Sequence, residues 1–188
     1  FAYVLVPVFL SRAFRHSTIF VRADGGITEP VSLKGRRVGL QEYDMTAAVV
    51  VRGFLRDYGV EPRDVLWKVG EAERTKPLEF PLGHPPDGVS IEILPPGRSL
   101  EERLLSGELD AIVSLRVPET FRQGDPRIVR LFPDPARAEK EWYAGQRIFP
   151  IMHAVGVRAT LAAKHPGLTR RVYEAFLAAK ARAVAELE

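Results

Sequence analysis

Two arginines and a histidine, Arg12, Arg15 and His16, lie between two apolar segments close to the start of the chain. The flanking segments are rich in β-branched and aromatic residues and are expected to form strands. Groups that carry or can acquire positive charge are costly to place beside buried strands unless an anion meets them. A guanidinium holds a carboxylate with two parallel hydrogen bonds, and a histidine exchanges a proton near neutral pH. These residues therefore predict a site for anion recognition and proton transfer.

A second candidate site lies where an expected strand is followed by the expected helix 45–58. Ligands of open α/β sheets bind beyond the carboxyl ends of the strands, where the free N–H groups of a helix N-terminus favour an anion. Glu42, Tyr43 and Thr46 lie in this connection, and Tyr43 and Thr46 are candidates for ligand contact. Ordinary helix capping is the alternative, and Asp44 is predicted to be the N-cap itself.

Two further candidates come from later strands. Arg116 directly follows the expected strand 110–114 and can form a bidentate pair with a carboxylate, with a surface arginine as the alternative. His153 is embedded in the apolar extended segment 147–158, where a histidine is more often a satisfied core residue. If His153 meets His16 in space, the two histidines are candidates for acid/base catalysis.

Cofactor chemistry has no support in the sequence. The nucleotide, phosphate, serine-nucleophile and zinc-protease motifs do not occur. The chain contains no cysteine, which excludes disulfides, thiolate nucleophiles and cysteine-ligated metals. A metal site formed by His16, His153 and Glu42 stays open, but no local spacing supports it. We therefore predict no cofactor.

The composition is that of a globular α/β protein. Of the 188 residues, 46% are hydrophobic, which is ample for a buried core in one large or two small domains. The charge balance of 27 basic against 24 acidic residues, without a basic run, argues against a nucleic-acid partner. The longest apolar segment, 2–10, is too short to span a membrane, so no membrane insertion is expected.

The start of the chain predicts a piece of a longer protein, because Phe1 lies inside an expected strand. A cytoplasmic location is expected, or a periplasmic one if the preceding segment carries a signal peptide. A homo-oligomer is compatible with the sequence.

Hydrophobic periodicity and turn residues predict strands that alternate with helices. This order predicts a mainly parallel sheet covered on both faces by helices, and the proline-rich segment 70–88 is predicted to be a loop. The expected strands are 2–9, 18–22, 36–40, 65–69, 89–94, 110–114 and 128–132, with extended chain at 147–158, and the expected helices are 45–58, 99–106, 134–144 and 167–188.

Five segments carry a resemblance to a known family: PVFLSRAFRHSTIFVR, LKGRRVGLQEYDMTAAVVVRGFL, LSGELDAIVSLRVPETF, RLFPD and IFPIMHAVGVR. Together they resemble the 4,5-dihydroxyphthalate decarboxylase family, whose members have a type 2 periplasmic-binding-protein fold. FRHS and FPIMH are specific to that family, whereas LKGRRVG and SGELDA occur widely among solute-binding proteins. The sequence departs from the family pattern at Val50 and Val51, where an aromatic residue is common, and in a longer loop around 77–88.

The resemblance implies two lobes joined by two hinge crossings. Residues 1–22 would form part of the first lobe and one crossing, 23–146 the second α/β lobe, and 147–188 the return crossing and a helix of the incomplete first lobe. Closure of such lobes would exclude water from the cleft.

The same resemblance implies non-oxidative decarboxylation of a small anionic aromatic substrate, a hydroxylated acid of the 4,5-dihydroxyphthalate type. It assigns carboxylate or phenolate binding to Arg12 and Arg15 and acid/base catalysis to His16, assisted by His153. Contacts from the facing lobe would come from Glu42, Tyr43, Thr46 and Arg116.

Two other functions remain open. A solute-binding protein of an ABC-type transporter would capture a small anionic aromatic carboxylate with the same arginines and no chemistry. A regulatory effector-binding domain would need a DNA-binding segment outside this chain. Two histidines near one cleft favour the enzyme, because a carboxylate receptor has little need of groups that titrate near neutrality.

Overall fold

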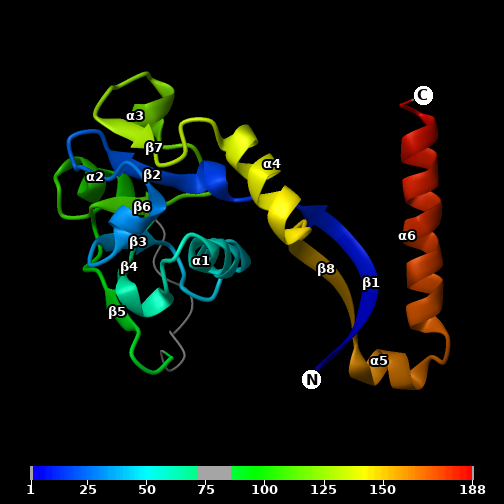
Figure 1. Ribbon diagram of the computed structural model, residues 1–188. Coiled ribbons are helices and arrows are strands. Elements are labelled where there is room, and N and C mark those ends of the chain that lie inside the picture. The colour runs from blue at the N-terminus through cyan, green and yellow to red at the C-terminus, as the bar shows by residue number, and fades with distance from the viewer. Residues whose placement is uncertain (1, 72–85, 188) are drawn as a thin grey trace. The chain divides into compact units, whose positions relative to one another are not determined.

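A computed structural model describes residues 2–71 and 86–187, and most of the predicted loop 70–88 lies outside them. The chain divides into two compact units (Figure 1). The larger unit is Phe14–Ile148, and the smaller unit combines Phe1–Ala13 with Phe149–Glu188. The first boundary falls nearer the N-terminus than the expected one after residue 22, because residues 19–22 pair with two strands of the larger unit.

The larger unit is built on a six-stranded sheet with the strand order β5-β4-β3-β6-β2-β7. Strands β3, β4, β5 and β6 run parallel, whereas β2 is antiparallel to both of its neighbours. The sheet is therefore mixed and, as predicted, mainly parallel, because β2 is the one described strand of this sheet that runs in the opposite direction. Its strands are β2 (Ile19–Arg22), β3 (Arg37–Leu40), β4 (Leu66–Val69), β5 (Ser90–Ile93), β6 (Ala111–Val113) and β7 (Ile128–Arg130).

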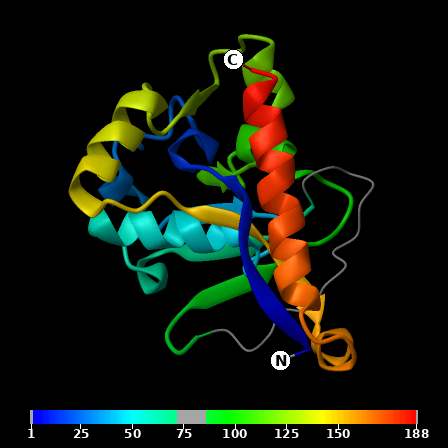
Figure 2. The ribbon, with the colours of Figure 1, turned by 90° about the vertical axis from the view of Figure 1, so that its right-hand side faces the viewer.

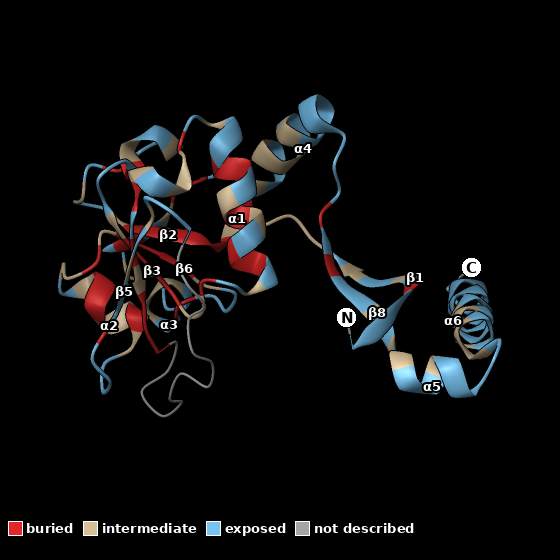
Figure 3. Cartoon of the chain, turned by 90° about the horizontal axis from the view of Figure 1, so that it is seen from below, coloured by how far each residue is buried: buried red, intermediate tan, exposed pale blue. Residues whose placement is uncertain are grey.

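Apolar residues alternate across this sheet and form a core on each face. In β2, Ile19 and Val21 join the larger cluster, whereas Phe20 joins the smaller cluster together with Ile112 of β6. Figure 3 shows buried residues concentrated on these strands and on one side of α1. Both faces of the sheet are thus covered, as predicted. The helices are α1 (Thr46–Asp57), α2 (Leu100–Leu105), α3 (Glu119–Arg122) and α4 (Pro135–Gln146).

Short 3₁₀ helices, η1 (His16–Thr18), η2 (Pro30–Leu33) and η3 (Pro62–Asp64), join some of these elements. An ion pair holds β3 against β6 at the end where both strands begin. Asp110 accepts hydrogen bonds from the backbone N–H and the guanidinium of Arg37, and these bonds lower the pKa of Asp110. The bond from the Arg37 backbone N–H to Asp110 fixes the relative position of the two strands.

Helix starts agree only in part with the prediction. Ser99 caps α2 in a capping box with Glu102 at the start of the predicted helix 99–106. The predicted cap of α1 is wrong, because Met45 rather than Asp44 is the N-cap and no side-chain cap bond is found among the described residues. Gly59, directly after the predicted helix 45–58, has the left-handed φ of 80° that is common just beyond a helix C-terminus.

The smaller unit is a two-stranded antiparallel ribbon with two helices. Strand β1 (Tyr3–Arg12) pairs with β8 (Ile151–Arg158), and α5 (Ala159–Lys164) and α6 (Leu168–Ala185) follow. Helix α6 packs against β1 and runs alongside it (Figure 2). The ladder is irregular between Val6 and Ser11, where Pro7 lacks the N–H needed for pairing.

No helix among residues 2–71 and 86–187 is both long and apolar enough to cross a membrane.

Candidate functional site

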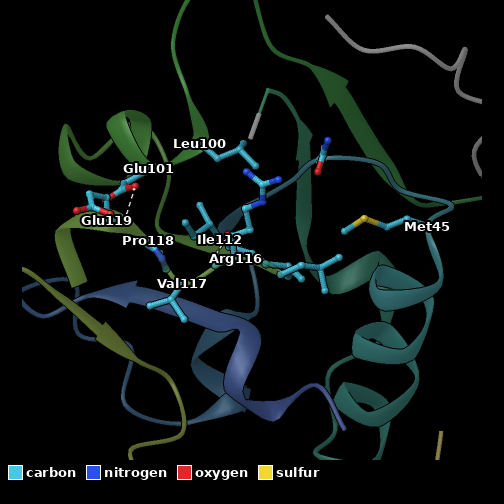
Figure 4. Close-up of a pocket in the computed structure, with 12 residues that line it drawn as sticks. Met45, Leu100, Glu101, Ile112, Arg116, Val117, Pro118 and Glu119 are labelled. Atoms are coloured by element: carbon cyan, nitrogen blue, oxygen red, sulfur yellow. Dashed lines mark hydrogen bonds between the residues drawn. The ribbon is translucent and has the colours of Figure 1, made fainter. Parts of the chain in front are cut away.

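A pocket of about 390 Å³ opens in the larger unit where the parallel strands β3 and β6 end. Its walls combine apolar side chains with one arginine, two carboxylates, an amide and a hydroxyl (Figure 4). This is the position at which open α/β sheets bind ligands. The lining residues are Gln41, Met45, Leu100, Glu101, Ile112, Val113, Ser114, Leu115, Arg116, Val117, Pro118 and Glu119.

The floor of the pocket depends on close packing of α2 against β3. A Cβ atom added to Gly39 would lie 3.0 Å from a methyl carbon of Leu100, so the glycine lets the start of α2 approach the sheet. Leu100 is fully buried at this contact, and the next residue, Glu101, lines the pocket. The sequence did not indicate this contribution, because Leu100 and Glu101 lie about 60 residues from β3.

Arg116 contributes the positive charge of the pocket wall. The Ser114 hydroxyl donates to the Arg116 backbone carbonyl over 2.6 Å, which fixes the turn after β6. Glu101 accepts backbone hydrogen bonds from Glu119 and Thr120, which hold the far end of the same loop. Figure 4 shows Arg116 beside Ile112, while Glu101 and Glu119 lie together at another side. The segment after β6 thus lines the pocket, and its contact with a ligand stays a prediction.

The N-terminus of α1 lies at the same pocket, because its N-cap Met45 is a lining residue. No acidic residue lies in the first turn of α1, and no side chain of the described residues caps it. The free N–H groups and the dipole of a helix N-terminus attract a carboxylate. The pocket therefore combines apolar walls with two features that favour a small organic anion, Arg116 and the α1 N-terminus. The two carboxylates of its wall, Glu101 and Glu119, already accept hydrogen bonds from groups of residues 119–123.

Tyr43 has a different environment from the one predicted. Its side chain is only 4% exposed, its ring packs edge-on against Trp67, and it is absent from the pocket lining. The Arg52 guanidinium lies 3.6 Å from the Tyr43 ring centroid and donates to the Tyr43 carbonyl. Burial raises the pKa of Tyr43 and lowers that of Arg52. The Arg52 guanidinium thus makes a cation–π contact, and Tyr43 anchors the connection instead of facing the pocket.

The other two predicted residues of this connection lie outside the lining. Glu42 is partly buried, and Thr46 is the exposed first residue of α1. Their neighbours Gln41 and Met45 line the pocket instead. The alternation of side chains after a strand could have indicated this choice, since Gln41 is the residue that directly follows β3.

His16 is enclosed by aromatic rings of the larger unit. Its ring stacks on Phe54 with centroids 4.2 Å apart, and it contacts the rings of Tyr58, Phe132 and Trp142. The side chain is 1% exposed, and neither ring nitrogen has a hydrogen-bond partner among the described residues. This desolvation lowers the pKa of His16 to about 4. The surroundings favour a neutral, structural imidazole, and the predicted acid/base role stays a prediction.

Arg15 precedes this histidine and is half-buried. Burial lowers the pKa of Arg15, and its carbonyl accepts a hydrogen bond from the Thr18 hydroxyl over 2.7 Å. Arg15 is not among the residues that line the pocket.

The remaining predicted residues, Arg12 and His153, lie in the smaller unit at one end of the β1–β8 ribbon. His153 is exposed, and its Nδ1 lies 2.6 Å from the Ser11 hydroxyl oxygen. The Arg12 guanidinium is 5.2 Å from the Phe9 ring centroid. His153 is thus a solvent-accessible histidine on an edge of the ribbon, rather than the satisfied core histidine that was the alternative. Ser11 was not singled out from the sequence.

No group of three or more histidine, cysteine, aspartate or glutamate side chains arranged for a metal occurs in the described part of the chain.

The fold belongs to the periplasmic-binding-protein-like class of α/β proteins. A family model described as NMT1/THI5 like matches residues 11–78, which include β2, β3 and α1.

Two curated proteins are similar in sequence to this chain, and both are named 4,5-dihydroxyphthalate decarboxylase. The protein from Comamonas testosteroni is 46% identical over 186 residues, which are 98% of this chain and 56% of the relative. The protein from Pseudomonas putida is 45% identical over 142 residues, which are 75% of this chain and 55% of the relative. The resemblance to this family is therefore confirmed, and the chain spans about half the length of the curated relatives it matches.

Proposed function

We propose that the full-length protein decarboxylates a hydroxylated aromatic acid of the 4,5-dihydroxyphthalate type. The observation that carries the proposal is the 46% identity over 98% of this chain with a relative named for that reaction. The pocket supports it, because apolar walls beside Arg116 and the uncapped α1 N-terminus suit an aromatic ring that bears carboxylates.

The chemistry defines what the protein must supply. The bond between the ring carbon and the carboxylate carbon breaks, its electron pair stays on the ring carbon, and carbon dioxide leaves. A proton takes the vacated position, so the reaction consumes one proton and needs no oxidant or reductant. A ring phenolate para to that carbon donates the electron density that allows the carbon to be protonated. The protein must therefore hold the carboxylates and deliver one proton.

We assign carboxylate binding to Arg116 and proton delivery to His153. Arg116 lines the pocket of the larger unit, and His153 keeps the acid/base role that the family resemblance implies. Arg12 and Arg15 are proposed as further contacts for a carboxylate or phenolate. Because the His16 ring is buried with a pKa of about 4, it is a weak candidate for proton transfer at neutral pH.

Incubation of the full-length protein with 4,5-dihydroxyphthalate tests the proposal. We expect carbon dioxide and 3,4-dihydroxybenzoate to be released in equal amounts. Liquid chromatography measures the acid, and trapping of the gas measures the carbon dioxide. Arg116→Ala should raise KM by about tenfold or more, since a charge-assisted hydrogen bond contributes about 1.5–3 kcal/mol. The exposed Arg36→Ala serves as the control and should leave KM unchanged. Absence of both products with a protein that binds the acid would overturn the enzymatic proposal.

Binding of the acid without turnover would support a second candidate function, which the match to the NMT1/THI5-like model favours. A solute-binding protein for a small aromatic carboxylate would use the same pocket without turnover. Isothermal titration calorimetry alongside the turnover assay separates the two, because a receptor binds tightly and leaves the acid intact.

A further inference from the structure

The closest polar contact of the predicted acid/base residue His153 is with a serine on the neighbouring strand. Ser11 Oγ and His153 Nδ1 are 2.6 Å apart, a short hydrogen bond between side chains separated by 142 positions in the sequence. The two residues are also direct ladder partners in the β1–β8 ribbon. The position of the imidazole ring is thus fixed by both the backbone pairing and a side-chain bond.

The ladder around this pair is irregular. The register shifts between Val6 and Ser11 and again between Ser11 and Arg12. Such irregularities disrupt regular pairing and re-aim side chains, and they are over-represented next to active sites. Here the shifts bring a serine opposite a histidine in strands that are otherwise mostly apolar.

The bond engages one of the two ring nitrogens. Nδ1 contacts the hydroxyl, which leaves Nε2 as the nitrogen available to a substrate. The side chain of Ser11 is partly buried, whereas His153 is exposed. When a neighbouring group forms a hydrogen bond with one ring nitrogen, that bond sets the tautomer and the orientation of the histidine.

We propose that Ser11 is a positioning residue that accepts a hydrogen bond from Nδ1–H of His153, so that His153 exchanges protons with the substrate only through Nε2. The proposal rests on the proposed decarboxylation. In the proton balance, Nδ1 keeps its proton throughout, Nε2–H of the imidazolium transfers its proton to the ring carbon, and the neutral ring then regains a proton at Nε2 from water. Ser11 does not change its own protonation state.

Removal of the hydroxyl should affect the proton-transfer step more than substrate binding. We expect Ser11→Ala to lower kcat about tenfold, the effect of losing one hydrogen bond of about 1–1.5 kcal/mol, with KM changed less than twofold. Ser11→Thr keeps the hydroxyl and should restore most of kcat. Ser90→Ala, which changes an exposed serine at the start of β5 in the other unit, is the matched control and should leave both constants unchanged.

A spectroscopic measurement on the full-length protein tests the same bond without turnover. Ring nitrogen NMR of His153 at a pH where it is neutral should show a proton on Nδ1 in the wild type and a mixture of tautomers in Ser11→Ala. The exposed His165, at the end of α5, provides an internal reference whose spectrum should not change.

The outcomes separate this proposal from the proposed function. If the wild-type protein shows no turnover, the proposed decarboxylation is wrong. The tautomer measurement then still decides whether the Ser11–His153 bond fixes the ring. An active protein in which Ser11→Ala changes neither kcat nor the tautomer, or a wild-type ring protonated on Nε2 alone, would overturn the positioning role. A loss of kcat that Ser11→Thr fails to restore would also contradict it.

Discussion

At the scale of single residues, His16 and His153 show how differently one residue type can be placed. His16 lies within four aromatic rings at 1% exposure, whereas His153 is exposed on a ribbon. Both lie within or beside apolar, strand-forming segments of the sequence, so the local pattern does not separate a buried histidine from an exposed one. Only the three-dimensional neighbours separate a buried imidazole, which resists protonation, from an accessible one.

The buried imidazole predicts a pH-dependent stability. The pKa of His16 is lowered from 6.5 to about 4 by burial, so the unfolded chain binds its proton more readily than the folded chain. The stabilisation is complete above about pH 6.5 and is lost as the pH falls toward 4. At pH 5 the loss amounts to about 2 kcal/mol. Urea unfolding at pH 7.5 and 5 should show this loss in the wild type and not in His16→Phe.

The same variants test the role of His16 in the reaction. Phenylalanine can keep the stack on Phe54, so His16→Phe should retain turnover if the residue is structural. Loss of turnover in a folded His16→Phe variant would restore the acid/base role that the sequence predicted. His165→Gln, which changes an exposed histidine, should alter neither turnover nor the pH dependence of unfolding. If wild type and His16→Phe lost the same free energy of unfolding between pH 7.5 and 5, the pH dependence of stability would not come from His16.

At the scale of elements, the pocket depends on helix ends and strand ends that are set by local chemistry. Ser99 and Glu102 exchange bonds with each other's backbone N–H groups, which starts α2 where Leu100 and Glu101 reach the pocket. Asp134 likewise accepts from the Arg137 N–H at the start of α4. The α1 N-terminus differs, because its N-cap Met45 leaves the first-turn N–H groups to a ligand or to water.

Removal of the α2 cap should destabilise the larger unit. Ser99→Ala loses the acceptor for the Glu102 N–H and should lower the free energy of unfolding by about 1 kcal/mol. Ser99→Asp, which can accept the same bond, should retain most of the stability. Urea denaturation followed by circular dichroism measures the effect. If Ser99→Ala changed stability as little as the exposed Ser90→Ala, the capping box would have no energetic role.

At the scale of the whole molecule, the hydrophobic core is distributed very unevenly. Both core clusters draw all of their members from residues 19–142, within the larger unit. In the described part of the smaller unit, the buried hydrophobic side chains are Val6 and Met152, whereas residues such as Leu5 and Leu10 are exposed at 73% and 58%. A two-stranded ribbon with so little burial is marginally stable by itself.

This distribution predicts that residues 14–148 fold when expressed alone. They retain both core clusters and the six-stranded sheet, so they should unfold in a single cooperative urea transition. Circular dichroism and tryptophan fluorescence should give coincident curves, since Trp67 and Trp142 both lie in this unit. A gradual transition without a midpoint would show that the larger unit depends on the smaller one.

Several features could be predicted from the sequence alone: the element order, most of the element positions and the family resemblance. The cap at Ser99 and the turn at Gly59 follow from equally local chemistry. Each of these depends on residues close together in the chain, where hydrophobic period, capping and turn chemistry operate. The sequence also identified the segments after β3 and β6 that line the pocket, because the carboxyl ends of parallel strands gather at one edge of a sheet.

The tertiary structure, by contrast, selects which side chains of those segments face the pocket and which are buried. It made the sheet mixed, since the antiparallel pairing of β2 with β6 and β7 joins residues about 90 to 110 positions apart. It moved Tyr43 into the core under Arg52, enclosed His16 in aromatic rings and paired Ser11 with His153. These outcomes depend on packing and on the solvent exposure of single groups, and those properties are set by neighbours that are distant in the sequence.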